Sequence, residues 1–113
     1  AEMEATTLQD TGLSCFYQSR FRESLSLYKS ACRIIVEKFG HVHPDLSVPL
    51  FNLANLLAAG GDCVRAVPFY RAAYRINAMG LGEGHLWTET AREALEFTEA
   101  VVEEGMHETP QSP

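Results

Sequence analysis

A repeat of 42 residues constrains the fold of this chain more than any other feature. When the sequence is shifted by 42 positions, small, aromatic and basic residues fall on residues of the same kind. The identical pairs are Leu8 and Leu50, Tyr28 and Tyr70, Ala31 and Ala73, Arg33 and Arg75, Ile34 and Ile76, Gly40 and Gly82, and His43 and His85. Because 113 residues fit one domain, the two copies must be adjoining parts of one structure.

Each copy has the apolar spacing of two helices. Apolar residues recur three and four positions apart, and no segment alternates for long enough to suggest a strand. The expected helices span about 4–18, 21–39, 44–59, 63–79 and 86–104. The fifth helix matches best at a spacing of 41, which puts Trp87 on Leu46 and Leu95 on Ala54. The sequence therefore predicts an all-α fold of about five helices in two and a half antiparallel hairpins.

Small residues at matched positions explain how such hairpins pack. Two helices approach to about 8–10 Å only where the side chains at the crossing are small. Gly12 with Ser24 is predicted to form one crossing, and Ala54 with Ala66 the other. An isolated hairpin cannot bury its apolar faces, so neighbouring hairpins must stack. The expected result is a superhelical stack whose concave surface is formed by the first helix of each hairpin.

Composition narrows the location and the partners. The chain is 46% hydrophobic and has no apolar run long enough to cross a membrane, and we expect no secretory leader. Its net charge of -6 argues against nucleic-acid binding, which needs a basic surface. Three cysteines without CxxC spacing favour a reducing, cytoplasmic location.

Negative charge gathers at the C-terminal end. Residues 1–82 carry eight basic and seven acidic residues, a net of +1, whereas residues 83–113 carry eight glutamates and one arginine, a net of -7. This segment is either a solvated helix face or a face for a basic partner. The predicted domain spans 1–105, with repeats at about 4–43 and 44–85, a terminal helix at 86–104, and a disordered tail at 106–113.

The second copy resembles the tetratricopeptide repeat (TPR). The resemblance rests on the linker Gly40-His-Val-His-Pro-Asp45, the segment Leu50-Phe-Asn-Leu-Ala-Asn-Leu-Leu57, and the residues Gly61, Ala66, Phe69, Tyr70, Ala73 and Ile76. It covers about residues 4–104, and the long period with the His-Pro-Asp linker resembles the kinesin light chain variety. Leu86-Trp87 departs from the pattern where Pro-Asp is expected. The resemblance implies a non-catalytic adaptor or scaffold that binds peptides or partner helices.

The resemblance also implies which residues line the concave groove. They are Gln9, Leu13, Phe16 and Tyr17 of the first helix, Phe51 and Asn55 of the third, and Arg92 of the fifth. Asn55 stands where many such repeats hydrogen-bond a ligand backbone, since an amide both donates and accepts; the alternative is a solvated polar residue. The aromatic residues either form an apolar binding patch or pack into the core. Arg92 alone provides no clamp for a C-terminal carboxylate.

Four basic residues occupy matched positions on the second and fourth helices. They are Lys29, Arg33, Arg71 and Arg75. They either form a ridge that binds an acidic segment of a partner or belong to a solvated convex face.

No catalytic, metal or cofactor site is expected. His41, His43 and His85 invite a zinc interpretation, but no cysteine or carboxylate pair with ligand spacing adjoins them. The sequence has no nucleophile turn and no phosphate loop. We therefore expect a non-enzymatic module that binds a protein or peptide partner, or a second copy of itself. The alternative is a regulatory or docking domain of a larger multidomain protein or enzyme.

Overall fold

The computed structural model describes residues 2–108. Its elements are α1 (Glu2–Tyr17), α2 (Phe21–Phe39), the 3-10 turn η1 (Pro44–Leu46), α3 (Ser47–Ala59), α4 (Cys63–Leu81) and α5 (Leu86–Glu108). No strand occurs between residues 2 and 108, so the predicted all-α fold is confirmed. The helices begin and end within a few residues of their predicted bounds. The prediction of a disordered tail from residue 106 is wrong for 106–108, because α5 continues to Glu108; from residue 109 onward the tail lies outside the described residues.

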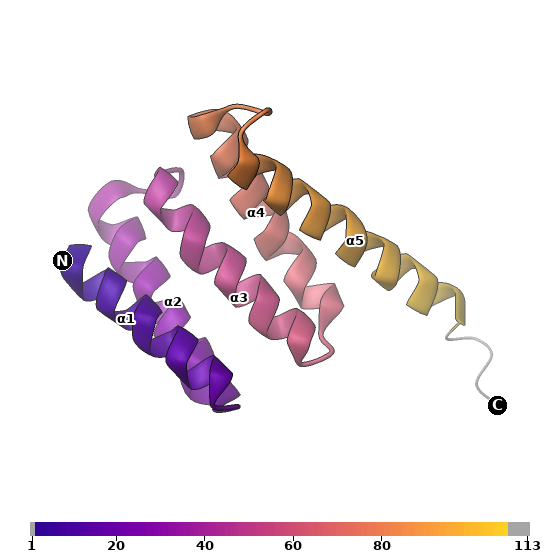
Figure 1. Ribbon diagram of the computed structural model, residues 1–113, viewed down its shortest axis with the longest axis horizontal. Helices are drawn as coiled ribbons and strands as arrows, with labels where there is room; N and C mark the ends of the chain where they lie inside the picture. Colours follow the sequence, from indigo (N-terminus) through magenta and orange to yellow (C-terminus); the bar gives the residue numbers. More distant parts are fainter. Residues whose placement is uncertain (1, 109–113) are drawn as a thin grey trace.

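The helices form antiparallel hairpins that follow one another across the molecule (Figure 1). α1 packs on α2, α3 packs on α4, and α5 lies along α4 with its C-terminal end projecting beyond the stack. The shortest extent of the molecule is 21 Å. This is about two helix diameters, as expected for a stack two helical layers thick.

The two linkers between hairpins have the same geometry, as the repeat predicts. Gly40 and Gly82 end α2 and α4 at φ values of 90° and 92°, which glycine adopts without strain. His43 and His85 follow, and each accepts a hydrogen bond at Nδ1 from the backbone N–H two residues later, at 3.1 Å. Each imidazole therefore satisfies a donor at the start of the next helix.

The predicted helix crossings are confirmed. Ser24 Oγ donates a hydrogen bond to the carbonyl oxygen of Gly12 at 2.7 Å. A Cβ atom added to Gly12 would lie 2.9 Å from Cε1 of Tyr28, so any larger residue at this point of α1 would force the ring or the helix to shift. At the equivalent crossing of α3 and α4, Ala54 and Ala66 are both fully buried. Close approach of the helices thus depends on small side chains in both hairpins.

The register of α5 differs from the prediction. Its buried residues lie 42 positions after buried residues of η1 and α3, in the pairs Leu46 and Thr88, Pro49 and Ala91, Leu53 and Leu95, and Leu56 and Thr98. The histidine caps obey the same spacing. The spacing of 41 predicted for this helix is therefore wrong, and Trp87 falls on the exposed Asp45 instead of the buried Leu46. The match at 41 residues aligned apolar residues with one another, whereas the face of α5 that packs on α4 includes two threonines.

Candidate partner-binding groove

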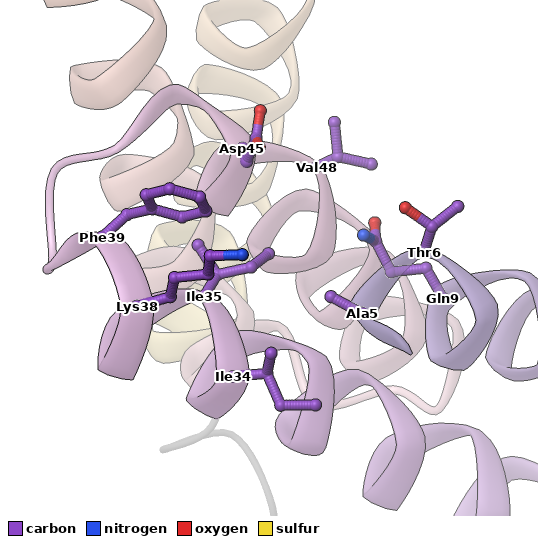
Figure 2. A pocket seen from close by; sticks show the side chains of 9 residues that line it. All are labelled: Ala5, Thr6, Gln9, Ile34, Ile35, Lys38, Phe39, Asp45 and Val48. Atoms are coloured by element: carbon purple, nitrogen blue, oxygen red, sulfur yellow. The ribbon is translucent and has the colours of Figure 1, made fainter. Parts of the chain in front are cut away.

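A first cavity of about 350 Å³ opens beside the N-terminal half of α1 (Figure 2). Its walls are Ala5, Thr6 and Gln9 of α1, Ile34, Ile35, Lys38 and Phe39 of α2, and Asp45 and Val48. Figure 2 shows Thr6 and Gln9 across from Val48. Of the groove residues predicted on α1, Gln9 therefore lines this cavity.

A second cavity of about 460 Å³ lies between the beginnings of α3 and α5 and the end of α4. Its walls are Ser47, Val48, Phe51, Asn77, Leu86, Trp87 and Thr90. The Trp87 side chain is 59% exposed, so a large apolar surface faces solvent here. Asn77 Nδ2 donates to the backbone oxygen of Trp87 at 3.3 Å and ties the start of α5 to α4.

Val48 lines both cavities. It stands in the first turn of α3, and its side chain is 46% exposed. The two cavities therefore adjoin at Val48 along α1, α3 and α5, and we call them together the concave groove. Apolar pockets with a few polar groups at their edges are the usual form of a binding site.

Tyr70 of α4 positions two of the predicted groove residues. Its ring meets that of Phe51 edge to face, with 5.4 Å between centroids, and its hydroxyl donates to Asn55 Oδ1 at 2.5 Å. Burial raises the pKa of the Tyr70 hydroxyl, which keeps it a donor. Asn55 Nδ2 has no partner among residues 2–108. The amide is therefore oriented to donate rather than to accept.

The other residues predicted on α1 line neither cavity. Leu13 and Tyr17 are exposed near the C-terminal end of α1, and Tyr17 reaches 77% exposure. Phe16 is half-buried between Tyr17 and Phe21, whose ring centroids lie 5.6 and 5.7 Å away. These three residues extend the apolar character of α1 beyond the first cavity.

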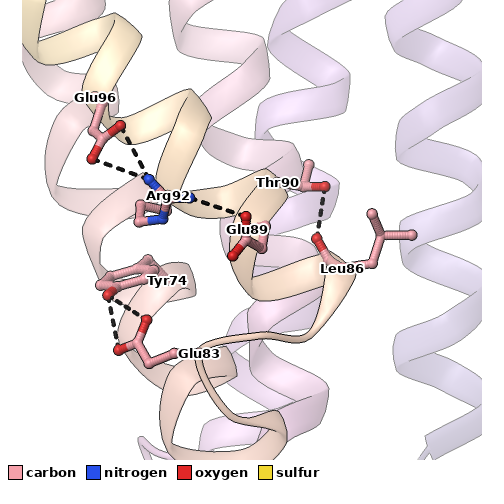
Figure 3. A network of polar contacts seen from close by, with 7 residues as sticks. All are labelled: Tyr74, Glu83, Leu86, Glu89, Thr90, Arg92 and Glu96. Carbon is pink, nitrogen blue, oxygen red and sulfur yellow. Dashed lines mark hydrogen bonds and ion pairs between the residues drawn. The ribbon is translucent and has the colours of Figure 1, made fainter.

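Arg92 lies on the opposite flank of α5 from the groove (Figure 3). Its guanidinium pairs with Glu89 at 3.0 Å and Glu96 at 3.4 Å on the same helix, and the hydrogen bond to Glu89 raises its pKa. Figure 3 shows these groups beside Tyr74, while Leu86 points the other way. The displacement follows from the register of α5, because a shift of one residue turns a helix by about 100°.

The basic residues of α2 and α4 are not equivalent in the structure. Arg71 pairs with Glu99 of α5 through a contact of 2.9 Å between Nη2 and Oε2. Lys29, Arg33 and Arg75 are exposed and form no ion pair with a residue of the described range. Arg71 thus fastens α5 to α4, and three of the four charges remain available to solvent.

The sequence did not single out Trp87, Leu86, Thr90 and Asn77 as wall residues. The histidine cap is the signal for two of them, because matching His85 to His43 at 42 residues places Trp87 and Thr90 on the exposed positions of Asp45 in η1 and Val48 in α3. The alignment of apolar residues at a spacing of 41 indicated a different register for α5.

The chemistry of the remaining reactive groups is limited. The three cysteines are free thiols, and burial raises the pKa of Cys32 to about 11. Within residues 2–108, no three His, Cys, Asp or Glu side chains gather as metal ligands would. None of the helices described combines the length and the apolar content needed to cross a bilayer.

Stacked helical hairpins, small crossing residues and a groove across the first helices define an α-helical repeat protein. The family model of the tetratricopeptide repeat matches residues 2–79, so the chain belongs to the tetratricopeptide repeat family. Repeats of this family generally mediate protein–protein interactions and are typically non-catalytic. A comparison with curated proteins finds no match.

Proposed function

We propose that this chain is a protein-interaction module that binds an apolar segment of a partner protein in the concave groove. The observation that carries the proposal is the position of Val48, which lines both of the two adjoining cavities. The exposed Trp87 adds the kind of large aromatic surface that dominates binding energy at interfaces.

Asn55 supports the same assignment. Its Oδ1 is engaged by Tyr70, so its Nδ2 offers a fixed donor beside Phe51. A donor at this place suits a backbone carbonyl of an extended or helical peptide. Asn55 lines neither cavity, but it stands about one helical turn after Phe51, so a peptide bound on Val48 and Trp87 would have to extend along α3 to reach its amide.

The variety of the repeat and the location of the chain are parts of the same proposal. The 42-residue period with matched histidine caps supports the kinesin light chain variety of the repeat. The three free thiols support a reducing, cytoplasmic location. The domain is proposed to span residues 1–105.

The test compares Val48→Glu with Val64→Glu. Both valines are exposed in the first turn of a helix, but Val64 lines neither cavity. Peptides selected on the unmodified protein should lose at least about tenfold in affinity for V48E, because the new carboxylate would be desolvated beneath the ligand. They should bind V64E normally.

Trp87 provides the measurement, because it is the single tryptophan of the chain and lies in the groove. Its emission should shift when a peptide binds. Equal affinities of every selected peptide for V48E and V64E would show that binding does not use the concave groove.

A further inference from the structure

A stripe of mostly apolar residues on α5 continues the concave groove. Thr90, Ala94, Phe97 and Val101 are spaced four, three and four residues apart, so they lie along one side of the helix. Thr90 lines the second cavity. Phe97 is 72% exposed and Val101 37% exposed, so the stripe leaves a large apolar surface uncovered. This spacing is the one that a second helix packs against.

Carboxylates without cationic partners border the stripe. Glu93 and Glu104 precede and follow Phe97 by four and seven residues, which places both on its side of the helix. Both are exposed, and neither makes an ion pair within the described part of the chain. By contrast, Glu89 and Glu96 pair with Arg92. Two of the uncompensated carboxylates of α5 therefore border the apolar stripe, whereas Glu103, which is also exposed and without an ion pair in the described range, lies on another side of the helix.

We propose that this stripe binds an amphipathic basic helix of a partner protein, whose apolar side chains are bordered by lysine or arginine. The proposal rests on the function proposed above, because the stripe extends the same groove. The partner's apolar face covers Phe97 and Val101, and its cations face Glu93 and Glu104. A dimer in which two α5 helices face each other is disfavoured, because residues 83–108 carry a net charge of -7 and the two helices would repel each other.

The experiment uses the full 113-residue chain and three synthetic helices of about 18 residues, near 27 Å long. All three carry leucine at the same heptad positions, flanked by lysine, glutamine or glutamate. Affinities are measured by fluorescence anisotropy of labelled peptides at low and high salt. We expect the lysine peptide to bind tightest and the glutamate peptide weakest. High salt should reduce the difference, since exposed ion pairs are screened.

The variants separate the stripe from the rest of the surface. Phe97→Ala should weaken all three peptides, and Val64→Ala is its control, since Val64 is exposed to a similar extent but lies on α4. Glu93→Gln with Glu104→Gln should weaken the lysine peptide about three- to tenfold at low salt, as two exposed ion pairs are lost. Glu37→Gln, on α2, should have no effect.

Each outcome decides between the proposals. Equal binding of the three peptides, or no binding at about 1 mM, overturns the basic-helix proposal. If Val48→Glu still weakens binding of the selected peptides, the proposed function of the concave groove stands without the basic-helix proposal. Sedimentation that shows a dimer dissociated by Phe97→Ala also overturns it and assigns the stripe to self-association. Suppose instead that Val48→Glu does not weaken binding, while the lysine peptide still binds most tightly and still depends on Glu93 and Glu104. This result would overturn the proposal that the concave groove is the binding site.

Discussion

Replacement of Gly12 by alanine tests the packing of the first hairpin. The added Cβ would lie 2.9, 3.1 and 3.4 Å from three ring carbons of Tyr28, whose side chain is only 1% exposed. A buried ring held on all sides cannot move away freely, so the substitution overpacks the crossing. Overpacking a core costs about 1–3 kcal/mol. Alanine also favours a helix over glycine by about 0.8–1.0 kcal/mol, which offsets part of this loss.

Gly105→Ala separates the two effects. Gly105 lies in α5, and a Cβ added there meets no atom within 4 Å. The helix-propensity gain is similar in both variants, so G12A should be less stable than G105A by about 2 kcal/mol. For a domain of this size the unfolding temperatures should differ by about 10 °C, measured by circular dichroism at 222 nm.

A double-mutant cycle checks the cause. In a Tyr28→Leu background the ring atoms that clash are absent, so Gly12→Ala should no longer be destabilising. The packing argument fails if G12A unfolds at or above the temperature of G105A. It also fails if the penalty persists without the ring.

Two further predictions concern polar groups. Thr88 is fully buried and its Oγ1 has no hydrogen-bond partner among the described residues, so Thr88→Val should raise the free energy of unfolding by about 1 kcal/mol in urea titrations; a decrease would contradict this. Asp62 caps α4, and the hydrogen bond from the Arg65 side chain lowers the pKa of the Asp62 carboxyl. The ionised carboxylate therefore stabilises the fold at pH values above the ordinary carboxyl pKa, and this stabilisation is lost as the pH falls through the lowered pKa. Asp62→Ala should therefore lower the unfolding temperature at about pH 7 and leave it unchanged at about pH 2, and an equal difference at both would refute the linkage.

The fold was predictable because each step depends on local signals that recur. Gly40 and Gly82 end two helices with a positive φ that few other residues tolerate, and a histidine cap follows each. Small residues at Gly12 and Ala54 mark the crossings. The duplicated helix ends and the duplicated small residues at the crossings are together compatible with one arrangement, a stack of hairpins.

The site was less predictable from the sequence. The register of a helix decides which of its flanks faces the groove, and the pattern of apolar residues does not determine that register. Thr88 and Thr98 are buried against α4, whereas Trp87 and Phe97 are exposed. Hydrophobicity alone predicts the reverse. The sequence therefore placed Arg92 in the groove, although its ion pairs with Glu89 and Glu96 lie on the other flank.

The same register explains how α5 divides its surface. In α3, Ala54 and Leu57 belong to the core cluster shared with Ala66 of α4. The residues 42 positions later are Glu96 and Glu99. A helix placed on this face of α5, as α4 lies on α3, would bury two carboxylates at a large desolvation cost. One face of α5 is thus packed on α4 and a second is solvated, which leaves the flank with Phe97 and Val101 as the apolar surface for a partner.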